Sequence, residues 1–171
     1  MKKLLLVLAV VLAQFSMAQS SKKISTFHRL LVFNSKNELM VVKIKNKDFW
    51  VTPGIYQNHK LLLNEGLNDL AETYGLTITP PKLRGIFTLK SDVSRDLSIR
   101  NIFVAHVKSS ELKRPGIIEE IKWLPVDQAL KLITFPHIKD IVKQVTSHPK
   151  TIWGGSLLQY QHDGDYKSRI I

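Results

Sequence analysis

Three carboxylates recur at helical spacing near the middle of the chain, and they are the side chains best suited to chemistry. At about 100° of turn per residue, Glu65, Asp69 and Glu72 fall within an arc of about 60° on one face of residues 61–74. Carboxylate oxygens are the ligands that a hard divalent cation such as Mg²⁺ prefers. The pattern therefore offers a metal site on this face, although the solvated face of any amphipathic helix has the same pattern.

The opposite face of residues 61–74 is apolar and predicts how the carboxylates are positioned. Its side chains recur at i, i+4, i+7 and i+11, namely Leu63, Leu67, Leu70 and Tyr74. We expect a helix with the three leucines buried and the carboxylates turned toward solvent or a cleft. Gly75 is a natural C-terminal stop for this helix.

This segment and its flanks resemble the Nudix box, whose pattern is G-x5-E-x7-R-E-U-x-E-E-x-G-U, with U a bulky apolar residue. The residues that match in register are Gly54, Leu70, Glu72, Gly75 and Leu76. Residues 27–145 also follow the family's order of elements. The resemblance implies an α+β fold, a Nudix-like α/β/α sandwich with a mixed central sheet.

The resemblance also implies chemistry. In the family, carboxylates hold Mg²⁺ or Mn²⁺ against a diphosphate, and water attacks phosphorus. Carried over to this chain, Asp69 and Glu72 would be the catalytic and metal-binding residues. Gly54 and Lys60 would lie at the substrate. The substrate would be a nucleoside diphosphate linked to another moiety, X.

Several positions depart from the family's pattern. Lys60 stands in place of the first glutamate, Asn68 in place of the arginine and Thr73 in place of the last glutamate. Asp69 keeps a carboxylate but shortens its reach. Glu65 lies outside the pattern and is a candidate substitute metal ligand. The loop is also one residue short if Pro53-Gly54 is aligned with the family's Pro-Gly-Gly.

These departures leave more than one function open. The first hypothesis is a metal-dependent pyrophosphohydrolase with weak or lost activity. The alternative is a pseudoenzyme whose cleft binds a ligand or a partner without turnover. A structural envelope protein that uses its basic surface is a third hypothesis. In the first two, the expected partner is a phosphorylated small molecule or another anion.

Composition narrows these choices. The 171 residues contain no Cys, which excludes disulfides and thiol nucleophiles, and the six His show no close pair at metal-ligand spacing. A net charge of +11 favours anionic partners, but Lys and Arg are spread along the chain without a nucleic-acid motif. The arginines considered for phosphate binding are Arg84, Arg95 and Arg100. The glutamates considered as a general base are Glu111, Glu119 and Glu120.

The N-terminus predicts export. Lys2 and Lys3 precede ten apolar residues, 4–13, and Ser16-Met17-Ala18 offers a cleavage site. The apolar run is half of the roughly 20 residues that a spanning anchor needs. We therefore expect a signal peptide at 1–18, a Nudix-like domain at 19–148 and a tail at 149–171. The mature protein would be periplasmic or extracellular, with no transmembrane anchor after cleavage.

Periodicity predicts the remaining elements. Short apolar or alternating runs between turn signals favour strands, and 3.6-residue periods favour helices. The expected strands are 27–33, 38–44, 83–89, 99–107 and 117–123, and the further helices are 126–133 and 138–145. The tail shows no clear period.

Overall fold

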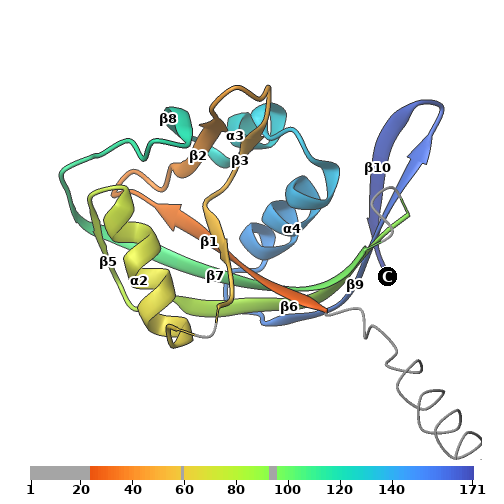
Figure 1. The fold of residues 1–171 in the computed structure, drawn as a ribbon, viewed down its shortest axis with the longest axis horizontal. Coiled ribbons are helices and arrows are strands. Elements are labelled where there is room, and N and C mark those ends of the chain that lie inside the picture. The colour runs from red at the N-terminus through yellow and green to blue at the C-terminus, as the bar shows by residue number, and fades with distance from the viewer. Residues whose placement is uncertain (1–23, 59, 93–95) are drawn as a thin grey trace, which may run out of the picture.

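A computed structural model describes residues 24–58, 60–92 and 96–171, which form a curved sheet flanked by helices (Figure 1). The predicted signal peptide lies outside the described residues. In the described part of the chain, no helix is long and apolar enough to cross a membrane. The helices are α2 (Leu63–Thr73), α3 (Val126–Leu132) and α4 (Pro136–Ser147). The strands are β1 (Ser25–Phe33), β2 (Leu39–Ile44), β3 (Trp50–Val51), β4 (Gly54–Tyr56), β5 (Leu76–Ile78), β6 (Lys82–Ser91), β7 (Asp96–Ser110), β8 (Ile118–Leu124), β9 (Trp153–His162) and β10 (Asp165–Ile170).

The sheet is mixed, as predicted. Its strands run in the order β10-β9-β6-β7-β1-β2-β3, while β4 pairs with β1, β5 with β7 and β8 with β2. β1 is parallel to β7, and β6 is parallel to β9. The other pairings are antiparallel.

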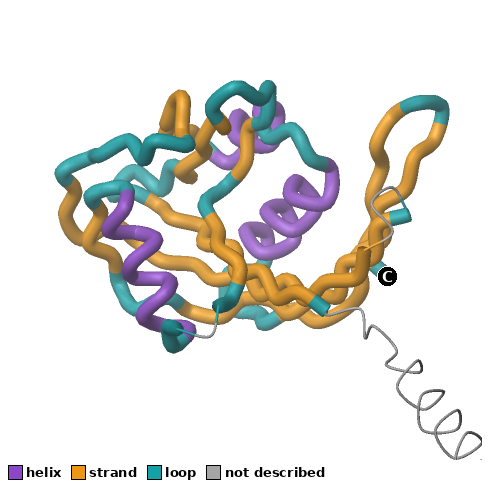
Figure 2. Tube along the Cα trace, viewed as in Figure 1, coloured by secondary structure: helices purple, strands orange, loops and turns teal. Residues whose placement is uncertain are grey.

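The central strand β1 has a hydrophobic core on each of its faces. Leu31 and Phe33 pack with side chains of α3 and α4. Leu30 and Val32 pack with the buried face of α2. Because successive side chains on a strand point to opposite faces, a strand covered on both sides reads as a continuous apolar run. Figure 2 shows the resulting layers, with α2 on one side of the sheet and α3 and α4 on the other. The predicted α/β/α sandwich is confirmed.

Helix α2 buries most of the face that its period predicts. Leu67, Leu70 and Tyr74 are only 2%, 9% and 5% exposed. The prediction for Leu63 is wrong, because its side chain is 38% exposed. The helix begins at Leu63, so this residue points in the expected direction but lies beyond the end of the core.

The last segment, in which the sequence shows no period, forms a hairpin of two strands. β9 runs beside β6, with Trp153 opposite Gly85, and β10 folds back antiparallel to β9. Asp163 and Gly164 join the strands, and both have positive φ, 52° and 83°. An Asp-Gly pair with positive φ at both residues is favoured in two-residue hairpin turns. In Figure 1 the turn of this hairpin projects from the rest of the molecule.

Candidate functional site: an arginine-lined cleft beside the Nudix-like segment

The three predicted metal ligands lie on the exposed face of α2, where the helical period places them. Glu65 has a local task, because its Oε2 accepts the backbone N–H of Leu62 at 2.8 Å and so stabilises the start of the helix. Within the described residues, no group of three or more His, Asp or Glu side chains is arranged to hold a metal ion. The side chains present do not form a metal cage, and the roles of Asp69 and Glu72 stay predictions.

The C-terminal end of α2 is closed by the loop that follows β7. The backbone N–H of Glu111 donates to the carbonyl of Gly75, and that of Lys113 donates to the carbonyl of Tyr74, both at 2.9 Å. Gly75 has φ +69°, and a Cβ there would lie 1.9 Å from the Glu111 carbonyl oxygen. Only glycine therefore fits this position of the segment. Glu72, Glu111 and Lys113 line a cavity of about 500 Å³ at this end.

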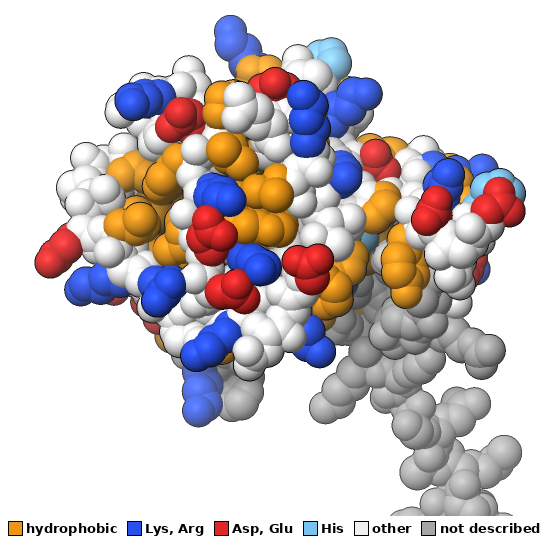
Figure 3. Space-filling model, turned by 90° about the horizontal axis from the view of Figure 1, so that it is seen from above, with side chains coloured by type: hydrophobic (Ala, Val, Ile, Leu, Met, Phe, Trp, Pro, Cys, Tyr) orange, Lys and Arg blue, Asp and Glu red, His pale blue; other side chains and the backbone are white. Residues whose placement is uncertain are grey.

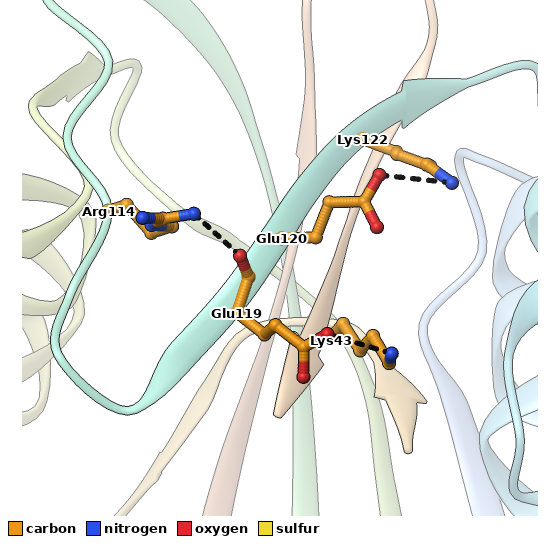
Figure 4. A network of polar contacts seen from close by, with 5 residues as sticks. All are labelled: Lys43, Arg114, Glu119, Glu120 and Lys122. Carbon is orange, nitrogen blue, oxygen red and sulfur yellow. Dashed lines mark hydrogen bonds and ion pairs between the residues drawn. The ribbon is translucent and has the colours of Figure 1, made fainter. Parts of the chain in front are cut away.

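Two of the general-base candidates, Glu119 and Glu120, lie on β8 and pair with lysines (Figure 4). Glu119 Oε1 is 2.9 Å from Lys43 Nζ, and Glu120 Oε1 is 3.1 Å from Lys122 Nζ. Arg114 also donates to the carbonyl oxygen of Glu119. Exposed ion pairs of this kind contribute little to stability. Neither glutamate lines the cleft described below.

A cleft of about 410 Å³ begins beside Gly54, the first residue of β4. A Cβ on Gly54 would lie 2.5 Å from the ring of Phe27, so the missing side chain lets this ring lie against the backbone. Lys60 is exposed in the loop before α2, where its N–H donates to Asn58 Oδ1, and it does not line the cleft.

Two arginines occupy the wall of the cleft. Arg29 on β1 is only 5% exposed, and its Nη1 donates to both the carbonyl and the hydroxyl oxygen of Thr52, each at 2.9 Å. Arg100 on β7 is half-buried. The Cζ atoms of Arg29 and Arg100 lie 5.1 Å and 4.9 Å from the centroid of the Phe27 ring. Both guanidinium groups therefore contact one aromatic platform, a favourable cation–π arrangement.

A buried histidine, His137, completes the polar wall. It is the second residue of α4 and is 9% exposed. Among the described buried atoms, its Nδ1 and the Nε of Arg100 have no hydrogen-bond partner. A buried polar atom without a partner is costly unless something else supplies one.

The charged side chains that are described in the wall of the cleft are both positive, namely Arg29 and Arg100. Burial, and then the charge of Arg100, lowers the pKa of Arg29 to about 9, and burial also lowers the pKa of Arg100. Burial, followed by the charges of both arginines, lowers the pKa of His137 to about 3, which leaves its imidazole neutral near pH 7. Among the lining residues whose side chains the structure describes, none is Asp or Glu.

Comparison with solved structures places the fold. The chain matches a MutT protein from Bacillus halodurans (TM-score 0.66, 21% identity, covering 86% of this chain and 97% of that one). It matches a Nudix hydrolase from Nitrosomonas europaea (TM-score 0.64, 12% identity, covering 76% of this chain and 93% of that one). It also matches the Nudix domain of Shewanella oneidensis NrtR, solved in complex with ADP ribose (TM-score 0.63, 14% identity, covering 81% of this chain and 98% of that one). The chain has a Nudix-like fold. No family model matches it, and no match is found among curated proteins.

The structure brings together residues that the sequence predictions separated or missed. Arg100 was expected as a phosphate ligand and lies in the cleft, whereas Arg84 lines a different cavity, with Lys82 and His106. Arg95 lies outside the described residues. Arg29 and His137 were missed. The sequence did offer a signal for Arg29, which is a charged residue in a strand that is apolar apart from Arg29 and His28. A charged residue is almost never fully buried unless it is paired, so a buried one calls for a partner.

Basic side chains do not form a separate patch on the face shown in Figure 3. In the view of Figure 3, Lys and Arg side chains are interspersed with Asp, Glu and hydrophobic side chains. On this face the net positive charge is not gathered into one patch.

Proposed function

We propose that this protein is exported and binds a phosphorylated small molecule, with weak or lost metal-dependent hydrolysis of a nucleoside diphosphate linked to X. The observation that carries the proposal is the cleft beside Gly54, which is lined by Arg29 and Arg100 and, among the side chains described, by no acidic one. Its volume of about 410 Å³ falls within the range of small-molecule sites. The Nudix domain solved with ADP ribose has the same fold and supports a ligand of this class.

Weak or lost hydrolysis follows from the side chains of the Nudix-like segment. A bound divalent cation would polarise phosphoryl oxygens and activate water. Asp69 and Glu72 are the in-register carboxylates left to hold it, and Glu65 is engaged at the start of α2. Lys60 places a positive charge where the pattern has a glutamate, and like charges repel a nearby cation. The ligand is therefore expected to be held chiefly by the cleft.

Calorimetric titrations with Mg²⁺, with Mn²⁺ and with ADP-ribose, and measurement of the hydrolysis of ADP-ribose to AMP and ribose 5-phosphate, test this proposal. We expect ADP-ribose to bind, metal affinity to be poor and hydrolysis to be slow. The double variant Lys60→Glu, Thr73→Glu should raise metal affinity, because it restores two carboxylates of the pattern.

A matched control makes the same charge change on exposed residues away from this segment, Lys36→Glu with Thr151→Glu, and should not raise metal affinity. Brisk Mg²⁺-dependent turnover that Asp69→Ala or Glu72→Ala abolishes would show an active hydrolase instead. If neither binding nor turnover of ADP-ribose is found, this nucleotide class is wrong.

Export has its own test. N-terminal sequencing of the mature protein from its own cells should begin at or near Gln19, because the positive residues, the apolar run and the Ser16-Met17-Ala18 site form a signal peptide pattern. Recovery of an intact Met1 in the mature pool would contradict export by this route.

A further inference from the structure

We propose that Arg29 and Arg100 bind a phosphate group of the ligand directly, without a bridging divalent cation, on the platform formed by the Phe27 ring. The inference deepens the proposed function and rests on it, because it assumes that the ligand carries a phosphate group. It differs from the chemistry of the Nudix-like segment, in which a metal ion would neutralise the phosphate charge.

Strand pairing places the three side chains together. Phe27 and Arg29 are two residues apart on β1 and so point to the same face of the sheet. Arg100 lies directly opposite Phe27 on the parallel neighbour β7. The guanidinium groups of Arg29 and Arg100 both lie about 5 Å from the Phe27 ring centroid, at 5.1 Å and 4.9 Å. Their positions are therefore set by backbone register and not by loops.

Each guanidinium is also oriented by its surroundings. Thr52 holds Nη1 of Arg29 through two hydrogen bonds of 2.9 Å, and Arg29 lines the cleft. The Arg100 side chain hydrogen-bonds with Tyr56, which also lines the cleft. The Nε of Arg100 is buried and has no partner among the described residues. A guanidinium fork matches phosphate geometry bidentately, and such charge-assisted hydrogen bonds are the stronger ones.

Among the side chains that the structure describes, none supplies a negative charge to the cleft. Arg29 is 5% exposed, and none of the ion pairs found among the described residues includes Arg29 or Arg100. A charge taken out of water without a partner is destabilising by several kcal/mol. An anionic ligand would supply the missing negative charge to both arginines at once.

His137 adds a second, independent feature that points to a ligand. Its Nδ1 is buried, lacks a partner and belongs to a residue that lines the same cleft. A neutral imidazole with its proton on Nδ1 would donate to a phosphate oxygen. The cleft thus offers two charged guanidinium groups and one neutral imidazole donor.

Titration of the purified protein with inorganic pyrophosphate, in EDTA and again in excess Mg²⁺, tests the inference. We expect binding in EDTA, with a dissociation constant that Mg²⁺ does not improve. Arg100→Gln should weaken binding at least tenfold. Arg100→Lys keeps the charge but loses the fork, and it should give an intermediate loss.

Arg84→Gln is the matched control, since it removes the same charge from a half-buried arginine that lines a different cavity, and it should change the dissociation constant less than twofold. Circular dichroism and thermal unfolding verify that each variant is folded. Arg29→Lys is a second variant in the cleft.

The outcomes separate this inference from the proposed function. Binding of pyrophosphate or ADP-ribose only with Mg²⁺ would overturn direct binding but leave the proposed function intact. Equal losses in Arg100→Gln and Arg84→Gln would overturn it as well, because the binding would then depend on overall charge. If neither compound binds under any condition, both proposals fail.

Discussion

As the pH falls below 6.5, the free energy of unfolding should decrease by up to about 1.4 kcal/mol per pH unit. The group responsible is the imidazole of His137. Its pKa is about 3 in the folded protein and 6.5 as the ordinary value. Between these values the unfolded chain binds a proton that the folded chain does not. The stability is therefore fully present above pH 6.5 and is lost as the pH falls toward 3. Over the whole window the loss is about 5 kcal/mol.

The groups that face His137 account for the direction of this effect. Burial is the largest cause, followed by the charges of Arg29 from β1 and Arg100 from β7. None of the carboxylates whose side chains the structure describes lines the cleft to offset them. An imidazolium formed there would meet two like charges in a desolvated environment, which disfavours protonation.

Urea unfolding at pH 7, 6, 5 and 4 in phosphate-free buffer measures the slope. His137→Gln removes the titrating group, so its unfolding free energy should depend less steeply on pH than that of the wild type. His162→Gln removes an imidazole whose side chain is 66% exposed and serves as the control. Parallel curves for the wild type and His137→Gln would contradict the prediction.

Leu70→Ala should lower the free energy of unfolding by roughly 2–5 kcal/mol, through lost burial and the cavity left behind. Leu70 is 9% exposed and packs in the core between α2 and the sheet, with Leu30 and Val32 of β1. Chemical unfolding monitored by circular dichroism measures the change.

Leu63→Ala is the matched control on the same helix. Because the Leu63 side chain is 38% exposed at the first helical residue, its loss should cost less than about 1 kcal/mol. A larger effect at Leu63 than at Leu70 would mean that the packed face of α2 differs from the one described.

Period alone was enough to determine the faces of α2. A turn of about 100° per residue forces Asp69 and Glu72 away from Leu67 and Leu70, whatever the rest of the fold does. The ends of the helix were harder to predict, and Leu63 shows why. A period gives the direction of a side chain, whereas burial also requires that the core extend to that position. Exposure at Leu63 was therefore decided by tertiary packing.

The C-terminal hairpin had a local signal that periodicity does not detect. Asp163-Gly164 favours a two-residue hairpin turn, and the structure forms one there. Its place at the edge of the sheet, beside β6, depends on the parallel pairing of β6 with β9. Such a pairing joins residues about 70 positions apart in the chain, for example Gly85 with Trp153, and no local pattern specifies it.

The arginine cleft is the feature that only the tertiary structure decided. By itself the sequence determined the order of the main elements over residues 27–145, the exposed carboxylates, the glycine stop at Gly75 and the likeness to the Nudix box. Arg29, Arg100 and His137 come from β1, β7 and α4, and nothing in their local sequence states that they share a wall. The parallel register of β1 with β7 sets Arg100 opposite Phe27, and the packing of α4 on the sheet brings His137 to the same cleft. Local periodicity specifies the face of a helix or strand on which a side chain lies. The pairing of distant strands and the packing of the two hydrophobic cores decide which of these faces come together.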